Sequence, residues 1–186
     1  MELFFGFVLL LMAGAIVALF AMVGELGSRV PDPAAAGASS TEVQPVEDAR
    51  VGHSVTWPAG LEALGAADTA VLLVLSTVCS SCRTLATQLE KQRDPFPGRS
   101  WGVVVTCGDA ANGKQFIKYH GLDRVPHFVD VDANWVLAEF NVQSSPVGVL
   151  VAHSTVEAAL MFNDAAALNT TIARTLDGHR HEEVTT

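Results

Sequence analysis

Short apolar runs alternate with amphipathic stretches between about Gly52 and Leu176. Runs that are apolar on both faces are expected of the central strands of a buried sheet. Three runs have this character: Ala70–Leu75, Gly102–Val105 and Val147–Ala152. Val156–Met161 predicts a further strand closer to an edge. The alternation therefore predicts one α/β domain with a central mixed sheet and flanking helices.

The segments between the predicted strands have the marks of helices. Leu85 and Leu89 lie four residues apart, as on one helix face, and Asp94-Pro95 predicts the end of that helix. A second helix is predicted to end at Gly121, because glycine readily takes the left-handed conformation that follows many helices.

The last predicted helix begins after Asn163 or Asp164, either of which can accept a hydrogen bond from a free backbone N–H at the helix start. One apolar stripe follows this helix: Leu168, Ile172 and Leu176. Residues 177–186 are predicted to form a polar, frayed tail.

The N-terminal segment Leu3–Val23 runs for 21 positions without a charged or strongly polar side chain, which is the length that an α-helix needs to cross a bilayer. A cleaved signal peptide would have a basic start and a shorter apolar run, whereas only Met1 and Glu2 precede this one. A buried core helix of this length is rarely apolar on all faces. The pattern predicts a retained transmembrane anchor at residues 1–24.

Residues 25–51 are expected to form a flexible linker. Pro31–Arg50 is rich in Ala, Pro, Ser and Gly and lacks any apolar period. Such a linker would hold a domain near a membrane surface while letting it reorient, and a plain spacer is the alternative. The predicted organisation is an anchor at 1–24, a linker at 25–51, a domain at 52–176 and a tail at 177–186.

The motif Cys79-Ser80-Ser81-Cys82 directly follows the first predicted strand and opens the first predicted helix. Free backbone N–H groups and the helix dipole favour negative charge at a helix N-terminus, which favours the thiolate of Cys79. Arg83 can add to this effect. Two intervening residues place the second sulfur within bonding distance, so Cys82 can attack a mixed disulfide on Cys79 and release the partner. This context predicts thiol-disulfide exchange.

A CxxC pair is also half of many zinc sites, and a silent structural pair is a further alternative. Zinc would need two more ligands, and the chain offers only Cys107 and six histidines without a second paired spacing. We therefore predict neither a metal nor a cofactor. Cys107 is expected to be a small buried residue, with a third redox partner as the alternative. His120, His127 and His153 are expected to be surface or packing residues.

Two segments carry a family resemblance. LVLSTVCSSCRTLATQLE resembles the active-site strand, CxxC and first helix of membrane-anchored thioredoxin-like proteins of the methylamine utilisation MauD kind, within the TlpA and peroxiredoxin-like branch. PHFVDVDANWVLAEFNVQSSPVGVLVAHSTVEAALMF is similar to the later part of that branch, where a strand and a helix precede a cis-proline loop and two strands. The resemblance covers about Thr69 to Leu176 and includes the anchor. It implies a thioredoxin-like fold with one N-terminal transmembrane helix.

The resemblance also implies roles for single residues. Cys79 corresponds to the attacking cysteine, Cys82 to the resolving cysteine and Pro146 to the cis-proline that faces them. The backbone of Ser145 would pair with an extended substrate segment. From the residues alone, a proline ahead of a strand is more readily an ordinary trans loop residue, because most X-Pro bonds are trans. Pro126 is the rival for the cis position and is assigned to the inserted strand.

The sequence departs from the pattern of many thioredoxins at three points. Val78 stands where many have tryptophan, and the polar pair Ser80-Ser81 replaces a motif that often contains proline. The strand AVLLVLS holds no acidic residue that could accept the proton of Cys82. The first two departures leave the reduction potential open, and the third leaves the rate of reduction open.

The net charge of the chain and its expected cellular compartment limit the classes of molecule that it can bind. The formal net charge is −9, with 20 acidic against 11 basic residues, which has the wrong sign for a nucleic-acid partner. Arg29 and Arg50 follow the apolar run and weakly favour a cytoplasmic domain. Thiol chemistry and the resemblance favour an oxidising compartment. We expect a single-pass cell-membrane protein with an extracytoplasmic domain.

The leading hypothesis is a membrane-tethered thiol-disulfide oxidoreductase that acts on cysteines of protein partners. The alternative is an accessory subunit of an integral-membrane complex, such as a respiratory one, in which the thioredoxin fold is a docking module. Small residues of the apolar run would then allow close helix packing: Gly6, Ala13, Gly14 and Ala18. Metal delivery, as by copper chaperones of this fold, is a third hypothesis, but their wider cysteine spacing and dedicated histidine are not evident.

Overall fold

The computed structural model describes residues 4, 6, 12, 42–92 and 94–183. The chain divides into two compact units, residues 1–40 and residues 41–186. The transmembrane anchor predicted at Leu3–Val23 lies outside the described residues, apart from Phe4, Gly6 and Met12. In the part of the chain that is described, no helix is both long enough and apolar enough to cross a membrane.

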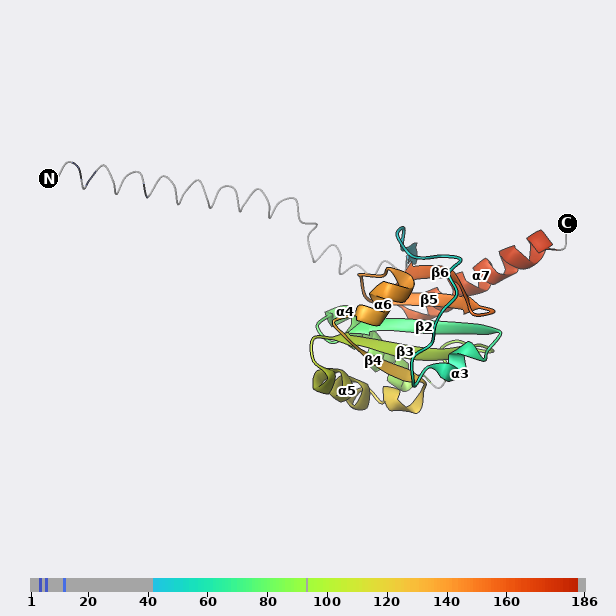
Figure 1. The fold of residues 1–186 in the computed structure, drawn as a ribbon, viewed down its shortest axis with the longest axis horizontal. Coiled ribbons are helices and arrows are strands. Elements are labelled where there is room, and N and C mark those ends of the chain that lie inside the picture. The colour runs from blue at the N-terminus through green and yellow to red at the C-terminus, as the bar shows by residue number, and fades with distance from the viewer. Residues whose placement is uncertain (1–3, 5, 7–11, 13–41, 93, 184–186) are drawn as a thin grey trace. The chain divides into compact units, whose positions relative to one another are not determined.

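The second unit is built on a six-stranded mixed sheet (Figure 1). From one edge to the other its strands are β1 (Gln44–Pro45), β6 (Thr155–Met161), β5 (Val147–Ala152), β2 (Thr69–Ser76), β3 (Ser100–Cys107) and β4 (His127–Val131). Strands β2, β3 and β4 run parallel to one another, whereas β5 pairs antiparallel with β2 and with β6, and β1 pairs antiparallel with β6. The four strands predicted from apolar runs are β2, β3, β5 and β6.

Strand β2 lies at the centre because both of its faces are apolar. Val71, Leu73 and Leu75 point into one core cluster, and Leu72 and Val74 point into the other. All five side chains are buried, so that β2 needs a partner strand on each side and a layer on each face. Because β2 is a central strand, its C-terminal end lies between neighbouring strands on both sides, and the chain leads from this end directly into Cys79 and Cys82.

Helices cover both faces of the sheet. They are α3 (Glu62–Gly65), α4 (Ser80–Lys91), α5 (Ala110–Tyr119), the 3-10 helix η1 (Leu122–Arg124), α6 (Asn134–Phe140) and α7 (Ala165–Glu183). Helices α4, α5 and α7 contribute side chains to one core cluster, whereas α3 and α6 contribute to the other. Gly148 of β5 allows α7 to approach closely, because a Cβ at this position would lie 2.5 Å from a methyl carbon of Leu168. The result is a three-layer α/β/α domain, as predicted.

The predicted helix ends are present. Gly121 takes the left-handed conformation (φ +60°) after α5. Asp164 rather than Asn163 caps α7, since its Oδ1 accepts the backbone N–H of Ala167 at 2.9 Å. Helix α7 continues to Glu183, so residues 177–183 of the predicted polar tail are helical. Polar residues continue a helix readily once its first turns are packed on a core.

The linker prediction needs correction, because residues 42–51 are part of the folded unit. Strand β1 pairs with β6, and the backbone N–H of Val46 donates to Ala159 O at 2.8 Å. Val43 and Val46 pack against the two core clusters. These two valines are too widely spaced within an Ala- and Pro-rich segment to show a period in the sequence, although both pack on the core.

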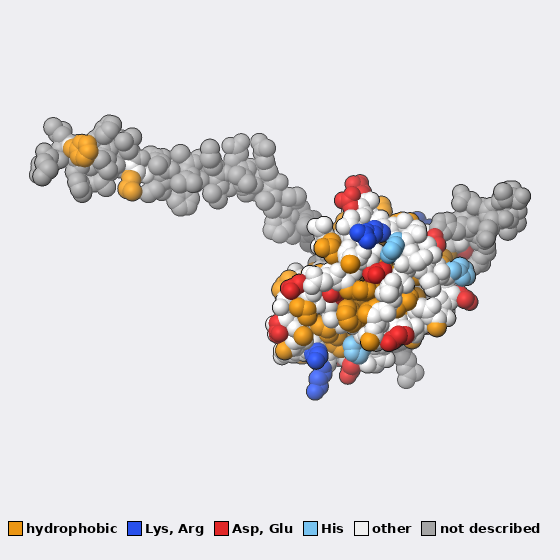
Figure 2. All heavy atoms as spheres, in the orientation of Figure 1, with side chains coloured by type: hydrophobic (Ala, Val, Ile, Leu, Met, Phe, Trp, Pro, Cys, Tyr) orange, Lys and Arg blue, Asp and Glu red, His pale blue; other side chains and the backbone are white. Residues whose placement is uncertain are grey.

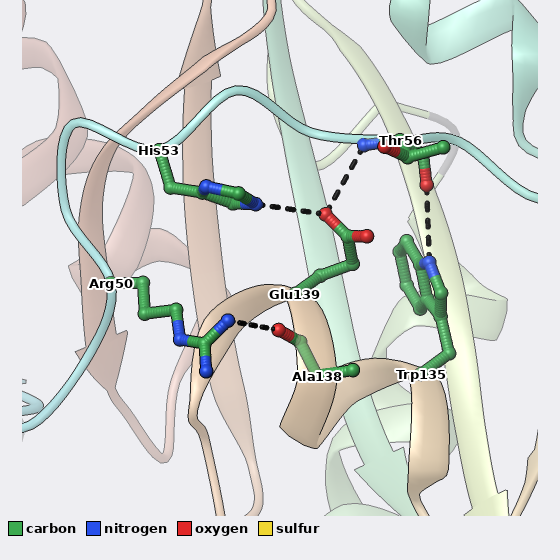
Figure 3. Close-up of polar contacts among 6 residues, drawn as sticks. All are labelled: Arg50, His53, Thr56, Trp135, Ala138 and Glu139. Atoms are coloured by element: carbon green, nitrogen blue, oxygen red, sulfur yellow. Dashed lines mark hydrogen bonds and ion pairs between the residues drawn. The ribbon is translucent and has the colours of Figure 1, made fainter.

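The segment after β1, up to Thr56, is hydrogen-bonded to helix α6 (Figure 3). Arg50 donates from its backbone N–H to Phe140 O at 3.0 Å and from its guanidinium to Ala138 O at 2.6 Å. Oε2 of Glu139 lies 3.3 Å from His53 Nε2 and accepts the backbone N–H of Thr56 at 3.2 Å. We call residues 42–57 the N-terminal strap. The strap holds α6, which leads into the loop that contains Ser145 and Pro146.

Apolar side chains gather over the face that carries β4 and α6 (Figure 2). Trp135 of α6 packs against three aromatic side chains, with ring centroids 5.8 Å from Phe128, 5.1 Å from Phe140 and 6.4 Å from Trp57 of the strap. Its indole N–H donates to Thr56 O at 3.1 Å. The inserted strand and helix expected from the family resemblance are thus β4 and α6, joined to the rest of the domain by aromatic packing.

Candidate active site at Cys79 and Cys82

Cys79 is the N-cap of α4. Its backbone is extended (φ −87°, ψ 122°), and its sulfur accepts the backbone N–H of Cys82 at 3.1 Å. The chain turns sharply between β2 and α4, where the N–H of Cys79 donates to Ser76 O at 3.3 Å. The N–H of Arg83 donates to Cys79 O at 3.3 Å and closes the first helical turn. Cys79 therefore stands at the start of the helix that follows β2, where the sequence places it.

The two sulfurs have different surroundings. Cys79 is partly exposed and Val78 beside it is 87% exposed, whereas Cys82 is fully buried among the side chains of the α4 core face. Burial raises the pKa of the Cys82 thiol to about 12, and its hydrogen bond with Cys79 acts in the same direction. The side chain of Ser145 opposes this rise in pKa by a weaker hydrogen bond to Cys82. The pair is thus one accessible sulfur backed by one buried, protonated sulfur.

The loop before β5 lies against the cysteine pair. The Ser145–Pro146 peptide bond is cis, and it is the only cis bond within the described residues. The thiol of Cys79 donates to Ser145 O at 3.5 Å. The bond before Pro126 is trans, and Pro126 O accepts the N–H of Val103 at 2.9 Å. The structure thus selects Pro146 over Pro126 as the cis-proline, as the resemblance implied, and it brings Cys79, Cys82 and Ser145 together.

No carboxylate within the described residues is among the groups that shift the pKa of Cys82. The buried carboxylate of the domain, Asp130, is 3% exposed and belongs to β4. Its two oxygens accept the backbone N–H groups of Trp135 at 3.1 Å and Val136 at 2.8 Å. Asp130 therefore caps α6, a role that the sequence analysis missed. An acidic residue three to five positions ahead of a short helix was the available signal.

Within the described residues, no hydrogen bond joins the third cysteine or a histidine to this pair. Cys107 ends β3, is 6% exposed and is tightly packed, because a Cβ on Gly113 would lie 2.9 Å from its sulfur. Burial raises its pKa. His127 Nδ1 contacts Val125 O at 2.8 Å, and His153 is exposed. Across the described residues no cluster of His, Cys, Asp and Glu could hold a metal ion.

His120 was expected to be a packing or surface residue and is buried at the C-terminal end of α5. Its ring packs against Phe116 at 4.6 Å and Tyr119 at 5.0 Å between centroids, and Nδ1 lies 3.5 Å from Thr87 Oγ1 of α4. Burial lowers its pKa, so its ring is neutral at neutral pH. His120 thus joins α4 to α5 beside the cysteine helix.

The mixed sheet, the cysteine at the start of the helix after β2 and the cis-proline loop before β5 define a thioredoxin-like fold. The chain is similar to the solved structure of MTB dsbF in its mixed oxidised and reduced forms, with a TM-score of 0.51, 19% sequence identity, and coverage of 62% of this chain and 84% of that one. It is also similar to the solution structure of a candidate protein disulfide isomerase from Bacteroides thetaiotaomicron. That match has a TM-score of 0.52 and 18% identity, and it covers 75% of this chain and 98% of the other.

At these identities the likeness concerns the fold. No family model matches the sequence, and no curated protein matches it.

Proposed function

We propose that this protein is a thiol-disulfide oxidoreductase that exchanges disulfides with cysteines of partner proteins through Cys79 and Cys82. One observation carries the proposal: the partly exposed sulfur of Cys79 caps a helix N-terminus and accepts the backbone N–H of Cys82 at 3.1 Å, while the sulfur of Cys82 is buried. An accessible thiolate can attack, and a buried thiol beside it can resolve the product.

The reaction conserves atoms and electrons within the two proteins. The thiolate of Cys79 attacks one sulfur of a partner disulfide, the partner's S–S bond breaks, and its second cysteine leaves as a thiolate that takes up a proton. Cys82 then loses its proton and attacks the sulfur of Cys79, which releases the first partner cysteine. The products are a Cys79–Cys82 disulfide and a partner dithiol, so two electrons pass to the partner. Run in reverse, the same steps oxidise a partner.

Cys82 sets the slow step in this scheme. With a pKa of about 12 it is almost entirely protonated at neutral pH, and the described residues place no carboxylate among the groups that shift its pKa. Among the hydrogen bonds of Cys82, the bond with Cys79 raises its pKa, whereas those with the Ser145 side chain and the Ser76 backbone favour the thiolate. Ser145 thereby contacts both cysteines, with its carbonyl toward Cys79 and its side chain toward Cys82.

The likeness of the fold to MTB dsbF and to a candidate disulfide isomerase is consistent with this reaction. We further propose that Leu3–Val23 anchors the chain as a single-pass protein of the cell membrane, with the domain on the extracytoplasmic side. The length of the apolar run supports the anchor, and the resemblance to MauD-like proteins and the thiol chemistry support the compartment. Protease protection in intact and lysed cells tests this topology, and a domain that stays protected in spheroplasts until lysis would reverse it.

Trapping tests the reaction. The full chain with Cys82→Ala, expressed in cells, should retain partner proteins in disulfide linkage through Cys79, because the resolving sulfur is absent. The variant with Cys79→Ser and Cys82→Ala is the matched control and should retain none. Equal recovery of partners by both variants would contradict the proposal and favour the accessory-subunit alternative, in which docking does not need the cysteines.

A further inference from the structure

A groove beside the cysteine pair runs between α4 and α5. It encloses about 630 Å³, and residues from the β2–α4 turn, from α4 and from α5 line it. Val78 and Tyr119 stand at its surface with 87% and 79% of their area exposed, while Phe116 and His120 form a buried floor. A large exposed aliphatic and a large exposed aromatic side chain at one hollow mark a surface on which an apolar side chain of another molecule can be desolvated.

The groove is within reach of any chain that is joined to Cys79. Val78 immediately precedes Cys79, and Arg83 lies one helical turn after it, with its N–H on Cys79 O. One helical turn rises about 5.4 Å and one residue of an extended chain spans about 3.5 Å, so two or three residues of a bound segment reach from the sulfur to the groove. Ser145 flanks Cys79 through its carbonyl, which leaves the groove for residues on the other side of the partner cysteine.

The charge of the groove is positive in a chain whose net charge is −9. Arg83 is the only Lys, Arg, Asp or Glu among the described residues that line the groove. Its guanidinium has no hydrogen-bond or ion-pair partner among the described residues of the chain. Glu90 acts on His120 electrostatically but does not line the groove. Lys114 and Lys118, on the same helix as His120, line a separate hollow with Ile117 and Phe128. An exposed, unpaired guanidinium beside an apolar surface is complementary to a carboxylate.

We propose that this groove selects the partner of the disulfide exchange: it binds a polypeptide segment that carries an aromatic or branched aliphatic residue and an acidic residue within about three positions of the reactive cysteine. The apolar side chain lies against Val78 and Tyr119, and the carboxylate pairs with Arg83. The inference rests on the proposed function, since it assigns a substrate preference to the same cysteines.

Peptides test the preference in a single exchange step. Four otherwise identical peptides carry a cysteine activated as its 2-thiopyridyl disulfide, followed by Tyr-Asp, Tyr-Asn, Tyr-Lys or Gly-Asp. The full chain with Cys82→Ala, reduced and held in detergent, attacks each peptide through Cys79 and releases pyridine-2-thione, which is measured by absorbance. We expect the Tyr-Asp peptide to react about threefold faster than Tyr-Asn and about tenfold faster than Tyr-Lys, as for one exposed ion pair formed or opposed.

Two variants and one control locate the effect. Adding Arg83→Glu should reverse the order of Tyr-Asp and Tyr-Lys, and adding Tyr119→Ala should reduce the advantage of Tyr-Asp over Gly-Asp by about threefold. Lys118→Glu makes the same change of charge outside the groove and should leave the order unchanged. Salt at about 1 M should flatten the preference for Asp, because it screens exposed charges beyond about 3 Å. Rates are compared among peptides within one variant, so a general change in the reactivity of Cys79 cancels.

The outcomes separate the two proposals. If no peptide releases thione faster with Cys82→Ala than with the chain that also lacks the thiol of Cys79, the oxidoreductase function fails and the preference falls with it. If all four peptides react at one rate, or if Lys118→Glu changes the order as much as Arg83→Glu, exchange stands and the groove has no part in selection.

Discussion

Two helices of this domain begin with different capping groups, although both begin beside the sheet. At α4 the free N–H of the third residue is met by the sulfur of Cys79, a partly exposed thiol. At α6 the corresponding N–H groups are met by both oxygens of Asp130, a carboxylate that is 3% exposed. A fixed carboxylate neutralises the helix N-terminus and makes it a structural joint. The thiol of Cys79, by contrast, places a reactive sulfur atom at the N-terminus of α4.

The largest expected effect comes from changing the capping sulfur itself. Cys79→Ser should abolish disulfide exchange, because a serine hydroxyl does not form the thiolate that attacks a disulfide. Serine is a favoured N-cap, so the free energy of unfolding should stay within about 0.5 kcal/mol of the parent chain. Exchange with a peptide disulfide and urea unfolding measure the two quantities. A variant that unfolds at clearly lower urea would show that the sulfur is needed for structure.

The capping carboxylate should show the opposite pattern. Asp130→Ala leaves two N–H groups of α6 without their acceptor, at a cost of about 2–3 kcal/mol in the free energy of unfolding. Asp130→Asn is the matched control and should recover part of this loss, since an amide oxygen accepts one of the two bonds. The exchange rate of the folded fraction should change little. A loss of exchange without a loss of stability would assign Asp130 a part in the reaction.

The pH dependence sharpens the contrast between the two cysteines. Burial, the largest of the causes that raise the pKa of Cys82, persists when Cys79 is held in a mixed disulfide, so the thiolate fraction of Cys82 should grow about tenfold per pH unit below its raised pKa. Release of a peptide held in mixed disulfide on Cys79 should therefore accelerate as pH rises from 7 to 10 without reaching a plateau. Stopped-flow fluorescence of a labelled peptide follows this step. A plateau below pH 9 would show that another group deprotonates Cys82.

The smallest effect is expected at the N-terminal strap. His53→Ala removes one side chain of the pair with Glu139, which lies partly in solvent, and should change the free energy of unfolding by about 0.5 kcal/mol or less. Arg50→Ala removes the guanidinium bond to Ala138 and offers a comparison on the same strap. Urea unfolding measures both. A loss well above 1 kcal/mol in either variant would mean that the strap is a principal support of α6.

The sequence was informative where one physical pattern dominates. Continuous apolar runs identified the central strands, since a strand buried on both faces has few other choices of composition. The CxxC motif between a strand and an amphipathic helix located the thiols, and the family resemblance selected Pro146 over Pro126 for the cis bond. These features depend on residues that are close in the chain.

Other features depend on contacts between distant segments and were not visible in the sequence. The sequence predicts a linker up to residue 51 because Val43 and Val46 show no period, yet both pack on the core and the strand between them pairs with β6, more than a hundred positions away. The groove between α4 and α5 joins Arg83 to Tyr119, and no local motif predicts that pairing. Asp130 was overlooked because its partners lie in a helix too short to show a clear amphipathic pattern.

The most direct test of the central claim is the order in which the native thiols react. The reduced full chain is alkylated with iodoacetamide at neutral pH for increasing times, then unfolded, labelled with a second reagent and mapped by peptide mass. Cys79 should be modified first, while Cys82 and Cys107 stay protected until the chain unfolds, because both are buried and have raised pKa values. Modification of Cys82 before Cys79, or of both at one rate, would contradict the assignment of Cys79 as the attacking and Cys82 as the resolving thiol.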